Sequence, residues 1–206
     1  VTLLFSIQRY GEVIEAFLEG LERRLGQRMD VTSIASVASF FVSRVDGKID
    51  PLLDSMAQPS AHLRGKLAIA NAALAYQLFL RTLATERWKR LSSAGAKPQR
   101  PLWASTSTKD PAYPDVYYVE ALVASETVNT VPPETLDAYR DHGEPALRIH
   151  EAIRNAPRHI ADLKKTGIDL DAVTRELEDE GVSKFAASYR SLLTGIEGKI
   201  GALAAR

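Results

Sequence analysis

The stretch Val37–Asp46 (VASFFVSRVD) decides how the rest of the chain is interpreted. It continues an apolar, β-branched run that begins at Val31, and it delivers a hydroxyl at Ser39 and a guanidinium at Arg44. If the run from Val31 to Val37 is a barrel strand, these side chains sit at its carboxyl end, where barrel enzymes keep their chemistry. A serine and an arginine there suit a phosphate, because the guanidinium is a planar fork of charged donors. The alternative is a helix-capping serine beside a solvated arginine.

The same pattern of strand followed by helix recurs along the chain. Short apolar runs predict strands at 1–5, 31–37, 101–105 and 127–131, each followed by residues with helical periodicity. Beyond Gly143 the sequence predicts only helices. The signals that we expect to begin, break or end helices are Ser6, Gly26, Pro59, Asp115, Pro157, Asp169 and Gly181, with one long helical segment from about Ala61 to Ser93.

Alternating strands and helices predict parallel βαβ units with right-handed crossovers. No glycine-rich phosphate loop follows any of the runs, which favours a barrel over an open nucleotide-binding sheet. A (βα)8 barrel needs eight strands, so four strands predict half of one. A chain that opens with Val1 inside a buried run also suggests a fragment. We therefore expect residues 1–145 to be the C-terminal half of a TIM barrel, with strands five to eight, and residues 146–206 to be helices that pack on it.

The composition is that of an ordinary globular protein. Hydrophobic residues make up 45% of the sequence, and 26 basic residues balance 26 acidic ones. The neutral balance removes the electrostatic argument for nucleic acid or an anionic membrane as a partner. The chain has no cysteine, which excludes disulfides and zinc–sulfur sites and fits the cytoplasm. No apolar run approaches the roughly 20 residues of a membrane helix.

Polar side chains at the other strand ends are the further candidates for chemistry. Ser105 and Lys109 follow the third predicted strand, and together with Ser39 and Arg44 they would form a phosphate-binding cluster if the strands are neighbours. Lys109 could instead be a Schiff-base nucleophile, although its polar surroundings argue against the lowered pKa that this requires, or it could be a solvated lysine. Thr2 could contact a substrate from inside the first strand, or could simply bond a backbone carbonyl. No histidine pair has metal-ligand spacing, so no metal or cofactor is expected.

Four stretches, taken in order, resemble the transaldolase family, and the last two resemble its longer bacterial form. They are Val1–Ser6 (VTLLFS), Ala35–Asp46 (ASVASFFVSRVD), Leu102–Tyr113 (LWASTSTKDPAY) and Thr127–Leu136 (TVNTVPPETL). The resemblance implies a (βα)8 barrel and a Schiff-base aldol mechanism without a metal. It also implies transfer of a dihydroxyacetone unit from a ketose phosphate, sedoheptulose 7-phosphate or fructose 6-phosphate, to an aldose phosphate in the pentose phosphate pathway.

The resemblance also implies roles for individual residues. Thr2 matches a threonine near the catalytic water, Ser39 a serine that contacts substrate, and Arg44 the arginine that holds the phosphate. Ser105 matches a serine near that phosphate. Shorter members have an arginine at the position of Ser107, and Lys109 is the candidate to replace it.

The Schiff-base lysine, the aspartate and the glutamate of the family match no position in these residues. We therefore expect this chain alone to be inactive and its partners to be sugar phosphates and the missing N-terminal half of the barrel. The alternatives are a non-catalytic half-barrel that binds a sugar phosphate or a partner chain, and a different barrel aldolase or isomerase.

Overall fold

A parallel sheet carries the fold, and its strands lie side by side in the order in which they occur in the chain. The computed structural model describes residues 1–56 and 60–204. Strands β1 (Ser36–Phe41), β2 (Gln99–Ala104) and β3 (Val128–Asn129) pair in the order β1-β2-β3. Consecutive order with right-handed crossovers places the connecting helices on one face of a sheet, as in a barrel wall. The described residues confirm an α/β fold with a parallel sheet, and that sheet is open.

The amino-terminal residues extend the sheet beyond β1. The Ser39 amide donates to the Val1 carbonyl at 2.9 Å, and the Phe41 amide donates to the Leu4 carbonyl at 2.8 Å. Only one bridge, Leu4 to Phe40, is regular enough to count as parallel pairing. Residues 1–5 therefore lie beside β1 but do not form the regular strand that was expected. The reason is that Leu3 adopts φ +62° and interrupts the extended backbone.

The strand expected at 31–37 is wrong in position, since β1 begins at Ser36. Residues 31–35 form turns and irregular backbone, although Val31 itself is buried. The Asp30 carboxylate accepts hydrogen bonds from the amides of Thr32 and Ser33 and closes a turn there. Ser39 consequently lies inside the strand, two residues before its end.

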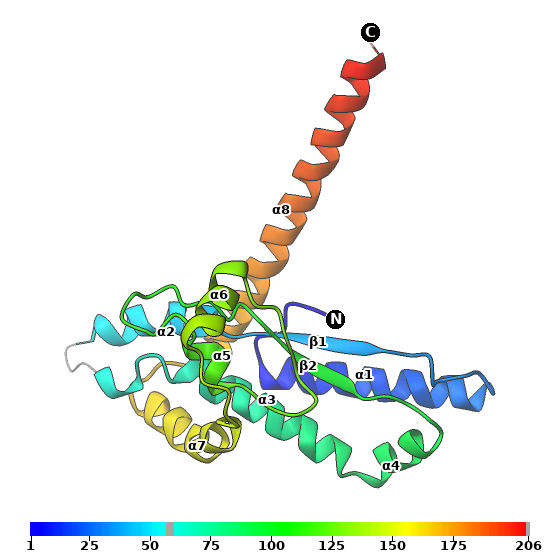
Figure 1. Ribbon diagram of the computed structural model, residues 1–206, viewed down its shortest axis with the longest axis horizontal. Coiled ribbons are helices and arrows are strands. Elements are labelled where there is room, and N and C mark those ends of the chain that lie inside the picture. Colours follow the sequence, from blue (N-terminus) through cyan, green and yellow to red (C-terminus); the bar gives the residue numbers. More distant parts are fainter. Residues whose placement is uncertain (57–59, 205–206) are drawn as a thin grey trace.

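Helices account for most of the remaining chain (Figure 1). α1 begins where expected, because the Ser6 hydroxyl accepts from the Arg9 amide, and it ends at Gly26. The helices are α1 (Ile7–Gly26), α2 (Ser43–Asp54), α3 (Leu67–Leu83), α4 (Glu86–Ser93), α5 (Tyr117–Ala121), α6 (Pro133–His142), α7 (Ile149–Lys165) and α8 (Leu170–Ala204), with a 3-10 turn, η1 (Ala61–Leu63).

Several expected helix boundaries are wrong. The long segment after Ala61 is divided, because Thr85 caps a new helix, α4, through the Trp88 amide. α7 continues through Pro157, and α8 continues through Gly181. A β-carbon on Gly181 would lie 3.1 Å from a Leu3 methyl, so this glycine permits close packing and does not stop the helix. The break expected at Pro59 lies outside the described residues.

The core lies between the sheet and its helices. Phe40 and Trp103 are register partners, and their rings meet edge to face at 6.3 Å. Tyr10 of α1 packs on Phe40, and the Trp103 indole donates to the Leu122 carbonyl at 3.1 Å. Because strand side chains alternate between faces, the row Ser39–Leu102–Val128 lies on the opposite face, and these residues are only half-buried.

The last helix leaves the body of the molecule. The first part of α8 is held by ion pairs from Lys48 to Glu176 and Glu180, and the helix then projects outward to the C-terminus (Figure 1). Its outer part carries large exposed apolar side chains at spacings of three and four: Val182, Phe185, Tyr189, Leu192, Leu193, Ile196, Ile200 and Leu203. We call these eight residues the α8 stripe.

Among the described residues, no single helix is long and apolar enough to cross a membrane. The bent pair of α3 and α4 passes that test by length and composition alone.

Candidate functional site

The carboxyl ends of β1 and β2 are fastened to each other by a serine pair. The Val42 amide donates to the Ala104 carbonyl, and the Ser43 amide donates to the Ser105 carbonyl, each at 2.9 Å. The hydroxyls of Ser43 and Ser105 lie 3.0 Å apart and share a hydrogen bond. Ser105 has φ +57°, a left-handed conformation that turns the chain sharply as β2 ends. Ser105, a predicted site residue, thus contacts Ser43. The next residue in the chain is Arg44, another predicted site residue.

Arg44 occupies the first turn of α2, immediately beyond this junction. Its guanidinium carbon lies 5.1 Å from the centroid of the Phe41 ring, and that ring in turn packs against Phe5 at 5.0 Å. Arg44 forms no ion pair with any residue that the structure describes. Stacking on a buried ring restricts the side chain while leaving its donors free. This is an arrangement that can bind an anion through a bidentate contact.

Ser39 and Thr2 lie on neighbouring segments. The Ser39 amide donates to Val1 and its carbonyl accepts from the Leu4 amide at 3.1 Å, which brings the segment containing Thr2 alongside β1. Ser39 is half-buried on the sheet face that looks away from Phe40, and Thr2 is exposed. Their proposed substrate contacts stay predictions.

Lys109 lines a hollow of about 390 Å³ beside α2, and Arg44 is not among its lining residues. Its surroundings are acidic. Arg64 already pairs with Asp54 and Asp110 there. The other carboxylates of the hollow are Asp46 and Asp50. Ser43 of the strand-end junction lines the same hollow, and the role of Lys109 as a phosphate anchor stays a prediction.

The carboxylates of Asp46 and Asp50 accept hydrogen bonds from backbone amides at the start of α3, so both have a structural role. Asp46 accepts from the Ala68 amide at 2.8 Å and from the Tyr118 hydroxyl at 2.9 Å. Burial, with a smaller contribution from the neighbouring Asp50, raises the pKa of Asp46 to about 7.

Asp50 in turn accepts from the Gly65 amide at 3.1 Å and from the Tyr113 hydroxyl at 2.6 Å. The loop after β2 is thereby tied to α2, the helix that carries Arg44. Burial and the neighbouring Asp50 raise the pKa of the Tyr113 hydroxyl, which keeps it protonated as the donor.

Two positions at this edge, Ser43 and Phe41, were not anticipated as site residues. The signal that could have found them is their place within the same strand-end stretch that contains Arg44. At the same edge, Thr106 donates to the Asn129 side-chain oxygen at 2.8 Å, fastening the end of β2 to β3. Thr106 is fully buried. Within 1–56 and 60–204, no group of three or more His, Asp or Glu side chains is placed to hold a metal ion.

Asp115 was expected to cap a helix and does not. Its carboxylate instead pairs with His142 at 2.9 Å, and α5 begins after Val116 without a side-chain cap. The pair raises the pKa of the exposed His142 imidazole and lowers that of Asp115.

Comparison with known proteins gives one consistent result. A family model described as Transaldolase/Fructose-6-phosphate aldolase matches residues 1–196. A protein named Transaldolase from Parafrankia sp. is 50% identical over 206 residues, covering 99% of this chain and 56% of the relative. A Transaldolase from Frankia alni is 49% identical over 98% of this chain and 55% of its own length. A Transaldolase 2 from Nostoc sp. is 45% identical over 97% of this chain and 56% of its own length. The chain spans about half the length of these curated relatives.

Proposed function

The chain belongs to the transaldolase/fructose-6-phosphate aldolase family, and from that membership we propose that it forms the phosphate-binding side of a transaldolase active site. The observation that carries this proposal is the junction at the ends of β1 and β2. There Ser43 and Ser105 join two adjacent strands, and Arg44 lies on the Phe41 ring without an ion-pair partner among the described residues. Barrel enzymes place substrate groups at the carboxyl ends of their strands.

In the proposed reaction, a dihydroxyacetone unit passes from sedoheptulose 7-phosphate or fructose 6-phosphate to an aldose phosphate. A lysine amine adds to the ketose carbonyl and expels water to form a Schiff base. Cleavage of a carbon–carbon bond releases the first aldose phosphate. The retained carbon nucleophile attacks the aldehyde of the second aldose phosphate, and water then releases the product and restores the lysine. The reaction belongs to the pentose phosphate pathway and we place it in the cytoplasm.

Arg44 is the main phosphate ligand in this proposal. Ser105 supports the phosphate beside it, Ser39 contacts the sugar from the inner face of β1, and Thr2 supports the catalytic water from the neighbouring segment. Lys109 is the least supported member, because it faces an acidic hollow.

The nucleophile in this proposal lies outside residues 1–206. The family uses a lysine on a strand, whereas β1, β2 and β3 contain no lysine. The chain then corresponds to the second half of a barrel, with residues 1–145 in the barrel and 146–206 in helices packed on it.

Two surfaces are suited to contact the other half of the barrel. One is the inner sheet row Ser39–Leu102–Val128, which is only half-buried. The other is the α8 stripe, where Phe185 is 53% and Leu192 59% exposed. Exposed apolar surface of this extent is typical of an interaction site.

The test is a donor–acceptor assay on this chain complemented with the segment of the Parafrankia transaldolase that the alignment does not cover. Turnover of fructose 6-phosphate with an aldose phosphate is expected only in the complemented protein. Arg44→Ala should then raise KM for the phosphorylated donor about ten- to a hundredfold, since a charge-assisted contact contributes roughly 1.5–3 kcal/mol. An unchanged KM would remove Arg44 from the site.

A second function is favoured by the α8 stripe. The chain would be a non-catalytic half-barrel that binds a sugar phosphate or a partner chain. In that case the complemented protein would bind fructose 6-phosphate in an Arg44-dependent manner and show no turnover.

A further inference from the structure

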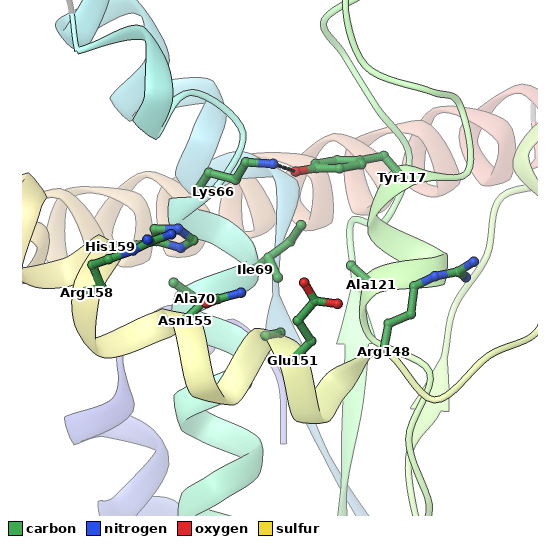
Figure 2. Close-up of a pocket in the computed structure, with 11 residues that line it drawn as sticks. Lys66, Ile69, Ala70, Tyr117, Ala121, Arg148, Glu151, Asn155, Arg158 and His159 are labelled. Atoms are coloured by element: carbon green, nitrogen blue, oxygen red, sulfur yellow. Dashed lines mark hydrogen bonds between the residues drawn. The ribbon is translucent and has the colours of Figure 1, made fainter.

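A hollow on the outer, helical side of the molecule collects basic side chains that the proposed active site does not use. It measures about 340 Å³ and lies between α3, α5 and α7 (Figure 2). None of its lining residues lines the acidic hollow, and none belongs to the Arg44–Ser105 junction. Its polar lining comprises Lys66, Tyr117, Arg148, Glu151, Asn155, Arg158 and His159, over an apolar floor of Ile69, Ala70, Ala121 and Ala152.

Most of these polar groups have no bond within the described chain. Lys66 Nζ donates to the Tyr117 hydroxyl at 3.0 Å, and that hydroxyl donates to the Gly65 carbonyl. In the part of the chain that the structure describes, Asn155 and Arg158 form no side-chain hydrogen bond or ion pair. Asn155 is half-buried and Arg158 is exposed, so the donors of both side chains are free to contact a ligand in the hollow.

The charges converge on the same space. Figure 2 shows Lys66, His159 and Arg158 along one side of the hollow, and Asn155 and Glu151 pointing up into it from α7. Burial lowers the pKa of His159, and the positive charges of Arg158 and Lys66 lower it further. Lys66 and Arg158 give this side of the hollow a positive charge, which the Asp162 carboxylate partly offsets at His159.

Arg148 contributes less to this charge, because it is already paired with Glu144 at 2.8 Å and lies near Glu120. Glu151 forms no ion pair with a described residue, and it is the one carboxylate of the lining. The site thus combines cationic donors with a single unpaired carboxylate.

We propose that this hollow binds a hydroxylated phosphomonoester, with the phosphate against Lys66 and Arg158 and a ligand hydroxyl donating to Glu151. An arginine fork and a lysine point charge, supported by amide and imidazole nitrogens, match the several oxygens of a phosphate. A bare anion would leave Glu151 as a repelling neighbour, whereas a hydroxyl gives it a bond. The site is separate from the proposed active site and does not depend on it.

The experiment is a titration of the whole chain with glycerol phosphate, followed by calorimetry and by the ring resonances of His159. Saturable binding with a shift of the His159 ring signals is expected. Arg158→Gln and Lys66→Met should each weaken binding about tenfold or more, because each removes a charge-assisted contact. Arg154→Gln is the matched control, since Arg154 lies exposed on the same helix outside the hollow, and it should leave the affinity unchanged.

A second comparison tests the role of Glu151. Glu151→Gln should weaken glycerol phosphate binding and should leave or improve the binding of inorganic phosphate, because it removes a negative charge. Equal effects on both probes would overturn the proposed hydroxyl contact.

A third comparison locates the site. Binding that survives Arg158→Gln and disappears in Arg44→Gln would overturn the proposal in favour of the strand-end junction. If a variant fails to fold, the wild-type titration still decides, since His159 signals that do not respond to millimolar glycerol phosphate also overturn it.

Discussion

The guanidinium of Arg44 lies over the ring of Phe41, with 5.1 Å from its central carbon to the ring centroid. Phe41 is the last residue of β1 and is buried against Phe5, so the ring is a fixed surface. A cation on an aromatic face gains about 0.5–1 kcal/mol at an exposed site. More important for binding, the contact reduces the number of rotamers that Arg44 must give up when it holds an anion.

Phe41→Leu in the complemented enzyme should raise KM for fructose 6-phosphate about two- to fivefold with little change in kcat. The physical reason is that leucine fills the core but offers no ring face to the guanidinium. Steady-state kinetics measure the effect. Phe79→Leu is the matched control, because Phe79 is also a buried phenylalanine and lies in α3. It should lower stability without changing KM. A Phe41→Leu enzyme with the wild-type KM would show that the ring does not position Arg44.

The serine pair should contribute measurably to stability. Ser43→Ala and Ser105→Ala each remove one partner of the 3.0 Å hydrogen bond, at a cost of about 1 kcal/mol. The double variant should cost less than the sum of the two, since both changes remove the same bond. Urea unfolding of the four proteins measures this coupling. Ser183→Ala on exposed α8 should change the free energy of unfolding by less than about 0.5 kcal/mol. Strictly additive costs would mean that the two hydroxyls do not interact.

The buried Asp46 predicts a dependence of stability on pH. Its folded pKa of about 7 exceeds its ordinary value of 3.8, so the native state binds the proton more tightly than the unfolded state. The resulting stabilisation is complete below about pH 4 and is lost as the pH rises through 7. The difference corresponds to at most about 4 kcal/mol.

Asp46→Asn removes this titration, so the variant should lose less stability than the wild type between pH 5 and pH 8. Urea unfolding at the two pH values gives the comparison. If the free energy of unfolding changes by the same amount in the wild type and in the variant between the two pH values, the assigned environment of Asp46 is wrong.

The α8 stripe should make the isolated chain associate. Leu192 and Ile196 are 59% and 45% exposed, and apolar surface of this kind is normally covered. Sedimentation should show concentration-dependent oligomers for the wild-type chain. Leu192→Lys with Ile196→Lys should reduce this association and leave the melting temperature of the body nearly unchanged. If the wild-type chain is monomeric at all concentrations, the α8 stripe does not drive association.

The sequence predicted the class of fold well and the local boundaries less well. β2 was placed within two residues because its apolar run is bounded by Pro101 and Ser105. β1 was placed too early, because the apolar character of Val31 is explained by burial in a turn that Asp30 closes. Gly181 was interpreted as a helix stop, whereas its missing side chain admits Leu3. Such contacts between distant segments are invisible to periodicity.

The site was predictable to the extent that it follows the strands. Ser43, the residue before Arg44, bonds Ser105 because adjacent parallel strands end at one edge. Lys109 is predicted beside them from its place after the third strand and from the family resemblance. The turn at Ser105 and the Tyr113–Asp50 hydrogen bond direct that loop toward the acidic face of α2.

Borohydride trapping with fructose 6-phosphate, followed by peptide mass mapping of the complemented protein, tests the central claim most directly. A Schiff base is reduced to a stable adduct on the lysine that formed it. The proposed function predicts an adduct on a lysine outside residues 1–206, weakened by Arg44→Ala at limiting substrate. An adduct on Lys109, or no adduct anywhere in a protein that folds and binds the substrate, would contradict it.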